Sequence, residues 1–222
     1  MIITSVELTS VPLVRLPNNV TIMYTNSRLP DNTATPLFIP VNLRGTGNEW
    51  FAVVDNRHLQ AIQNYVRGLP AASALFTPPG QSSPVSFNNI VTTLMTDMSG
   101  MFAGATSFNS EISSWDTSRV RFMVSMFGGA TAFDQPLNSW NVSNVLFMDG
   151  MFLNASSFNQ PLNSWNVSWV MSMISMFAFA TSFNQNISGW VVNNVRFANQ
   201  FRLGNILLTP NQLPRFRSGV TM

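Results

Sequence analysis

The pair Met-Phe recurs every 25 residues through the second half of this chain. Columns of Met, Phe, Trp and Val keep the same step, and no insertion breaks it. Each unit is therefore expected to be one turn of a stacked array, because a shifted residue would rotate every later side chain out of a common core. The predicted core of the repeats consists of Met101, Phe102, Phe108, Trp115, Met126, Phe127, Phe133, Trp140, Met151, Phe152, Phe158, Trp165, Met176, Phe177, Phe183 and Trp190.

Apolar spacing within one unit predicts its local structure. Met148, Met151 and Phe152 follow helical spacing, whereas the stretch from Phe158 to Val170 alternates as extended chain does. Each coil is therefore predicted to hold one or two helical turns and very short parallel strands, which makes the repeats α/β. The columns fade after residue 195, so four coils are expected, followed by a partial capping coil.

The chain before the repeats lacks the 25-residue period. Residues 1–75 are predicted to form a small β-rich α+β domain, residues 76–97 a linker and N-terminal capping coil, and residues 98–222 the repeats with their C-terminal cap. One helix is expected in the first domain, with Asp55 or Asn56 as its N-cap and Gly68 at its end. The expected strands lie within Ile2–Leu8, Val11–Leu16, Val20–Tyr24, Pro36–Leu43 and Trp50–Val54.

Charge is scarce, since charged residues make up 9% of the chain against about 25% in a typical soluble protein. Such a surface suits a protein packed against neighbours. The net charge of +2 does not indicate a nucleic-acid partner. The absence of Cys excludes thiolate metal sites and disulfides. The sequence contains no apolar run long enough for a transmembrane segment, and its first residues do not resemble a secretory signal.

Four arginines follow the last acidic residue, Asp149, and give the C-terminal end a local positive charge. An acidic partner could dock there, although a solvated cap explains the same pattern. These arginines are Arg196, Arg202, Arg215 and Arg217.

The blocks SFNQPLNSWNVS and AFDQPLNSWNVS, each followed by a Val, a Met and then Met-Phe, resemble the BspA-like leucine-rich repeat surface proteins. The resemblance is to their 25-residue mycoplasma-lipoprotein type and covers residues 95–208. It implies a right-handed leucine-rich-repeat-like solenoid without enzymatic activity, used for adhesion or protein contact.

Residues typical of catalysis or metal binding form no recognisable set. His58 is the only histidine and is expected on the surface of the predicted helix. The acids of the repeats occupy different repeat positions, so no pair of carboxylates is predicted. Gly45-Thr46-Gly47 is interpreted as a hairpin turn. We therefore predict no enzyme, no catalytic residue, no cofactor and no metal.

Some repeat positions carry Arg or a small residue in one coil and an apolar residue in another. Trp169 corresponds to Arg119, and Met171 corresponds to Arg121. A position that accepts Arg cannot be deeply buried, so its apolar counterparts are predicted to form a surface patch that contacts another protein. The alternative is that residues 1–75 fold back and cover them. The predicted interface consists of Leu146, Phe147, Trp169, Met171, Ile174 and Phe179.

These features together favour a non-enzymatic structural protein that is a subunit of a large hetero-oligomeric assembly. A virus particle, as a minor capsid or surface component, is the favoured assembly. The alternative is an exported adhesin or carbohydrate-binding module of the BspA-like type, at the cell surface or outside the cell. Both are functions that a repeat fold supports by analogy only.

Overall fold

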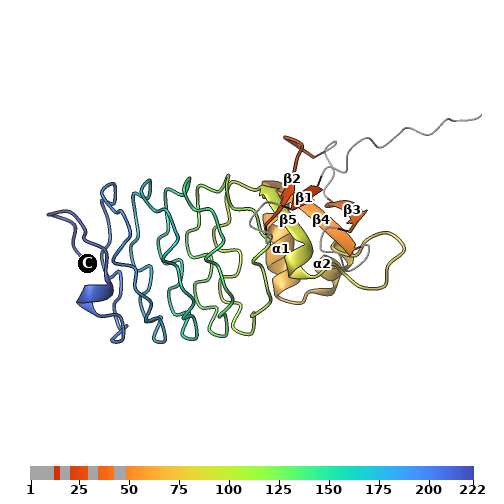
Figure 1. Ribbon diagram of the computed structural model, residues 1–222. Coiled ribbons are helices and arrows are strands. Elements are labelled where there is room, and N and C mark those ends of the chain that lie inside the picture. The colour runs from red at the N-terminus through yellow and green to blue at the C-terminus, as the bar shows by residue number, and fades with distance from the viewer. Residues whose placement is uncertain (1–12, 16–20, 30–34, 43–48) are drawn as a thin grey trace, which may run out of the picture.

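The computed structural model describes residues 13–15, 21–29, 35–42 and 49–222. Its strands, and its helices other than η3, lie at one end of an elongated molecule, and the repeats extend from them towards the C-terminus, where η3 lies (Figure 1). The elements are β1 (Leu13–Arg15), β2 (Ile22–Tyr24), β3 (Leu37–Val41), β4 (Glu49–Asp55), η1 (Asn56–His58), α1 (Leu59–Val66), α2 (Pro70–Leu75), η2 (Phe87–Asn89), β5 (Ile90–Leu94) and η3 (Pro210–Gln212).

The N-terminal part is built around the mixed sheet β3-β4-β5, in which β4 pairs antiparallel with β3 and parallel with β5. The four central residues of β4 are all buried because both faces of this strand are covered. Phe51 and Val53 pack in one hydrophobic cluster with β1 and β2, whereas Ala52 and Val54 pack in the cluster that continues into the repeats. β4 therefore joins two cores.

The predicted helix is confirmed, and its start is fixed by a capping box. The Asp55 carboxylate accepts a hydrogen bond from the backbone N–H of Arg57 at 3.0 Å, and the Nδ1 atom of His58 accepts one from the backbone N–H of Asp55 at 3.2 Å. Because its ring turns back to make this cap, His58 is only 1% exposed. The prediction that it lies on the helix surface is wrong.

Four of the five expected strand regions contain β1 to β4, and the fifth, Ile2–Leu8, lies outside the described residues. The Gly45-Thr46-Gly47 turn also lies outside them. The structure adds α2 and β5, which were not predicted. β5 falls in the stretch expected to be an irregular capping coil, and it extends the sheet of the N-terminal part instead.

The fold-class prediction is wrong. A four-coil α/β leucine-rich-repeat-like solenoid requires a helix and a strand in its coils, and the structure has neither between residues 95 and 209, all of which it describes. The strands of the described residues belong to the small mixed sheet and the β1-β2 pair, and helices are few. The 25-residue units consist of turns, and the β-pairing between one unit and the next is a single parallel bridge.

Residues with positive φ explain why the units form no helix. At two matching repeat positions, every unit has such a residue, with φ between 51° and 74°. A left-handed residue cannot continue a right-handed helix. The Met and Phe spacing that predicts helical turns is therefore satisfied by successive tight turns. The pairs are Gly100 and Gly104, Ser125 and Gly129, Gly150 and Asn154, Ser175 and Phe179, and Gln200 and Gly204.

Backbone amides that a helix would use internally bond to the next unit instead. The N–H of Phe102 donates to the carbonyl of Met126, and the N–H of Phe127 donates to the carbonyl of Met151, both at 2.9 Å. The same bond recurs from unit to unit up to Phe201. The units are therefore held together by hydrogen bonds that run along the stack, and we number them by residues 96–120, 121–145, 146–170, 171–195 and 196–220.

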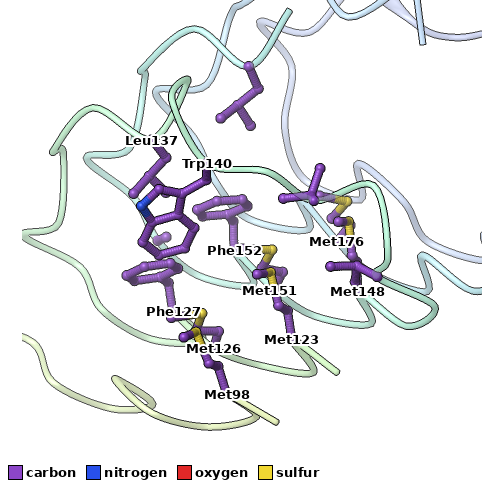
Figure 2. Packing of buried hydrophobic residues seen from close by; sticks show 14 of the residues in the cluster. Met98, Met123, Met126, Phe127, Leu137, Trp140, Met148, Met151, Phe152 and Met176 are labelled. Carbon is purple, nitrogen blue, oxygen red and sulfur yellow. The ribbon is translucent and has the colours of Figure 1, made fainter. Parts of the chain in front are cut away.

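All residues of the predicted repeat core are buried. Figure 2 shows Phe127 and Phe152 lying parallel beside Trp140, with Met123, Met126, Met148 and Met151 in neighbouring columns. The buried indole N–H groups are satisfied by the preceding unit, since Trp140 donates to the carbonyl of Ile112 at 3.2 Å and Trp165 donates to that of Leu137 at 2.9 Å. Each tryptophan thus fills the core and also fixes the register of two units.

A further column, made of Asn and Asp side chains, links successive units by hydrogen bonds. The Asp134 carboxylate accepts the backbone N–H of Asn159, and the Asn159 side-chain oxygen accepts the backbone N–H of Asn184, both at 2.9 Å. Gln212, at the end of η3, donates to the Asn184 side-chain oxygen at 2.9 Å. This column is therefore continuous from the second unit to the C-terminal segment.

Candidate interaction surface

Two neighbouring columns form the surface where the units bridge one another. Residues 121, 146, 171 and 196 are linked by backbone hydrogen bonds of 2.8–2.9 Å between successive units. Residues 97, 122, 147, 172 and 197 form the single parallel bridges beside them. Because these backbones are fixed in register, the side chains of equivalent residues lie one unit apart along the surface.

A pocket of about 220 Å³ opens in this surface, lined by Leu146, Trp169, Met171, Asn194 and Arg196. Trp169 is 63% exposed. Three of its lining residues, Leu146, Trp169 and Met171, belong to the predicted interface. The structure therefore brings half of that predicted set together around one hollow.

Trp169 stands at a repeat position whose occupants in the two adjacent units are hydrogen-bonded to the stack. Its equivalents Asn144 and Asn194 each donate a side-chain N–H to a carbonyl of the preceding unit, at 2.6 and 2.7 Å. Within the part of the chain that the structure describes, the Trp169 indole makes no hydrogen bond and no ring contact. Its side chain is therefore available to a partner.

The other predicted interface residues lie outside the pocket. Phe147 stacks on Phe122 with ring centroids 5.8 Å apart. Ile174 is partly exposed, and its backbone N–H donates to the Asp149 carboxylate at 2.9 Å. Phe179 is exposed at a left-handed corner, where its ring lies over Gly204 of the next unit. Phe147 and Ile174 flank the pocket residues in sequence, but Phe179 belongs to another corner.

Two residues of the pocket, Asn194 and Arg196, are missing from the predicted interface. The period places Asn194 one unit beyond Trp169 and Arg196 one unit beyond Met171. That spacing is the signal that could have found them. The sequence analysis assigns Arg196 to the basic C-terminal end instead.

The acids of the repeats accept hydrogen bonds from nearby backbone N–H groups or serine hydroxyls. Asp97 accepts the backbone N–H of Ser99 at 2.8 Å, and Asp116, which is buried, accepts that of Ser118 at 3.0 Å. Glu111 accepts the hydroxyl of Ser113 at 2.7 Å. Among the described residues no group of three His, Asp or Glu side chains could hold a metal ion.

Asp55 and Arg57 form the clearest charged pair, at 2.7 Å between Nη2 and Oδ2. Partial burial is the largest influence on the Asp55 carboxyl and raises its pKa, but hydrogen bonds from the side chain and backbone of Arg57 and the charges of His58 and Arg57 outweigh it. The pKa of Asp55 is therefore lowered. This pair caps a helix, and the exposed pocket lies elsewhere, in the third to fifth units.

The described residues thus define a repeat protein of stacked 25-residue units that exposes an apolar pocket on its bridging surface. The family model described as "Mycoplasma protein of unknown function, DUF285" matches residues 75–190 and 148–201. Together these matches span 75–201, more than half of the 222 residues, and the chain belongs to this family. Comparison with curated proteins and with solved structures gave no match.

Helices in the described residues are short. None of them combines the length and the apolar character that crossing a membrane requires.

Proposed function

We propose that this chain is a non-enzymatic subunit of a larger assembly and that the pocket around Trp169 binds another protein chain. The observation that carries the proposal is the exposure of Trp169 beside Leu146 and Met171. Trp and Met are enriched at the buried centres of interfaces. A side chain that is 63% exposed is not part of the hydrophobic core of its own chain.

The surface that Trp169 leaves exposed is large enough to matter for binding. An aromatic side chain of this size offers on the order of 150 Å² to a partner, or about 4 kcal/mol of transfer free energy before the costs of association. Interface residues that dominate binding contribute in this range. The scarcity of charge, 9% of the chain, supports the same proposal because such a surface repels its neighbours weakly.

Within this proposal, the BspA-like type of repeat is the finer family assignment that we favour, on the blocks around SFNQPLNSWNVS. A virus particle is the assembly that we favour. A carbohydrate-binding adhesin is the second candidate, because an exposed indole next to the polar side chains of Asn194 and Arg196 is a surface on which a sugar ring could stack.

The experiment compares Trp169→Arg with Val191→Arg. Arg119 stands at the position equivalent to Trp169, so the first change should leave the fold intact. Val191 is also exposed, at 54%, and does not line the pocket. Native mass spectrometry of the tagged chain from its source should show at least a tenfold loss of partner with Trp169→Arg and none with Val191→Arg.

Equal melting temperatures of the two variants and the parent chain are the control for folding. An unchanged complex with Trp169→Arg would contradict the proposal. Glycan-array binding by the parent chain that Trp169→Arg abolishes would favour the adhesin instead.

A further inference from the structure

Arg121, Leu146, Met171 and Arg196 follow one another along the bridging surface, and we call them the arginine-flanked column. The N–H of each later residue donates to the carbonyl of the one before it, at 2.9, 2.8 and 2.8 Å. Neighbouring backbones paired in this way lie about 4.8 Å apart, so the two arginines are about 14 Å apart along the stack. The column is apolar in its middle and positive at both ends.

No acidic residue that the structure describes forms an ion pair with either of the two arginines. Arg121 and Arg196 are exposed, and within the described ranges neither side chain has an ion pair or a hydrogen bond. Asp149, the last acid in the sequence, accepts hydrogen bonds from the Ser172 hydroxyl and from the backbone N–H of Ile174. Among the described residues, therefore, no acidic side chain supplies the charge that would complement the column.

We propose that the partner contacts this column with an extended segment that carries acidic side chains at positions i and i+4 and an apolar side chain at i+2. In an extended chain these three side chains point to the same face, and i and i+4 are about 13 Å apart. That spacing matches the two arginines, and the central side chain reaches the pocket at Trp169. The inference rests on the proposed function and specifies the chemistry of its partner.

The size of the pocket argues for an extended segment. A hollow of about 220 Å³ accommodates one large side chain. A helix laid along the column would need acids about ten residues apart to reach both arginines, because it rises about 1.5 Å per residue. Acids at both ends would also guide the partner into register, since complementary charge adds specificity and speeds association.

The test selects binders of the full chain from a phage-displayed library of random 12-residue peptides. The parent chain should enrich an acid-x-apolar-x-acid pattern. The best synthetic peptide, measured by fluorescence anisotropy, should bind Arg121→Glu/Arg196→Glu at least tenfold more weakly. The matched control, Arg215→Glu/Arg217→Glu, changes the net charge equally outside the column and should bind as the parent does. Binding should also weaken at high salt.

The outcomes separate this inference from the proposed function. If the selected peptides are apolar and lack paired acids, and the Trp169→Arg variant fails to bind them, the inference is overturned. The proposed interaction surface would then still hold. If the selected peptides carry acids about ten residues apart, the partner segment is a helix and not an extended chain, and the inference is also overturned. Peptides that Trp169→Arg binds as tightly as the parent would contradict the proposed function itself. If Arg121→Glu/Arg196→Glu and Arg215→Glu/Arg217→Glu weaken peptide binding equally, the effect of charge is not specific to the arginine-flanked column, and the inference is overturned.

Discussion

The N-terminal sheet and the stacked units bury their apolar residues equally well, but they satisfy their backbones differently. β4 pairs with strands on both sides, and η1, which leads directly into α1, begins with the Asp55 capping box. The units contain neither helix nor strand between residues 95 and 209, and their amides bond to the following unit. Regular secondary structure is thus dispensable where an identical neighbour supplies the missing partners.

This difference determines how far along the chain a destabilising substitution should have an effect. An element of the sheet is fixed by its own cap and its adjacent strands, whereas a unit depends on the units before and after it. A lost core residue in a unit should therefore weaken its neighbours as well. Four predictions test this contrast, in order of decreasing effect.

Trp165→Ala should have the largest effect, a loss of about 3–5 kcal/mol in the free energy of unfolding, because it leaves a cavity and an orphaned Leu137 carbonyl. Trp169→Ala is the control in the same unit and should change stability by less than about 0.5 kcal/mol. Urea unfolding measures both. Hydrogen exchange should also become faster at Phe152 and Phe177, whose amides bond to later units, while β4 stays protected. Uniform acceleration across β4 would contradict the contrast.

Gly104→Ala should cost about 1–2 kcal/mol, because a side chain disfavours the left-handed φ of +70° at this residue. A Cβ atom there would meet nothing within 4 Å, so the cost reports backbone strain alone. Gly189→Ala is the matched control, since its surroundings are equally open and its φ is not left-handed. Thermal unfolding should separate the two variants. Equal melting temperatures would show that the left-handed corners do not constrain the units.

Asn159→Ala should cost about 1 kcal/mol, since its side-chain oxygen accepts the backbone N–H of Asn184 and the Gln185 side-chain N–H, both at 2.9 Å. Asn159→Asp keeps that acceptor, as Asp134 does one unit earlier, and should be nearly neutral. Chemical denaturation can resolve this difference. If both variants lose stability equally, the column of side-chain acceptors does not tie the units together.

Protonation of Asp55 should have the smallest effect, and it should be confined to the N-terminal part. Because its pKa in the folded chain lies below the ordinary value of 3.8, the stabilisation is complete above that value and is lost as the pH falls through the lower folded pKa. Its partner Arg57 is 42% exposed, so solvent screens the pair and only a slight decrease in melting temperature is expected there. Asp55→Asn should remove the dependence. A persistent decrease below pH 4 in that variant would assign it to another acid.

The identity of the buried residues could be predicted, but the local structure of the units could not. An unbroken period requires Trp140 and Phe152 to have the same surroundings in every unit, and this holds whatever the backbone does. Apolar spacing alone does not separate a helical turn from successive tight turns. Ser125, Phe179 and Gln200 occupy left-handed corners without the glycine that would have signalled them.

In the N-terminal part and at the candidate surface, too, some features could not be predicted from the sequence. Ile90–Leu94 forms a strand only because β4, far away in the sequence, offers it an edge. His58 is buried because its ring closes a cap, which composition cannot show. The exchange of Arg119 for Trp169 indicated an exposed position, but the hollow beside it depends on how neighbouring units stack.

The direction of the hydrogen bonds between units has a mechanical consequence. Because these bonds point along the stack, a force applied between its two ends passes through every interface between units, and the last unit, which has a neighbouring unit on one side only, should detach first. The stack should therefore extend by detaching units sequentially from the C-terminal end, at modest force, while the sheet resists longer. If the chain is placed in an assembly as proposed, it would act there as a compliant spacer between the partner at its surface and whatever holds its N-terminal part.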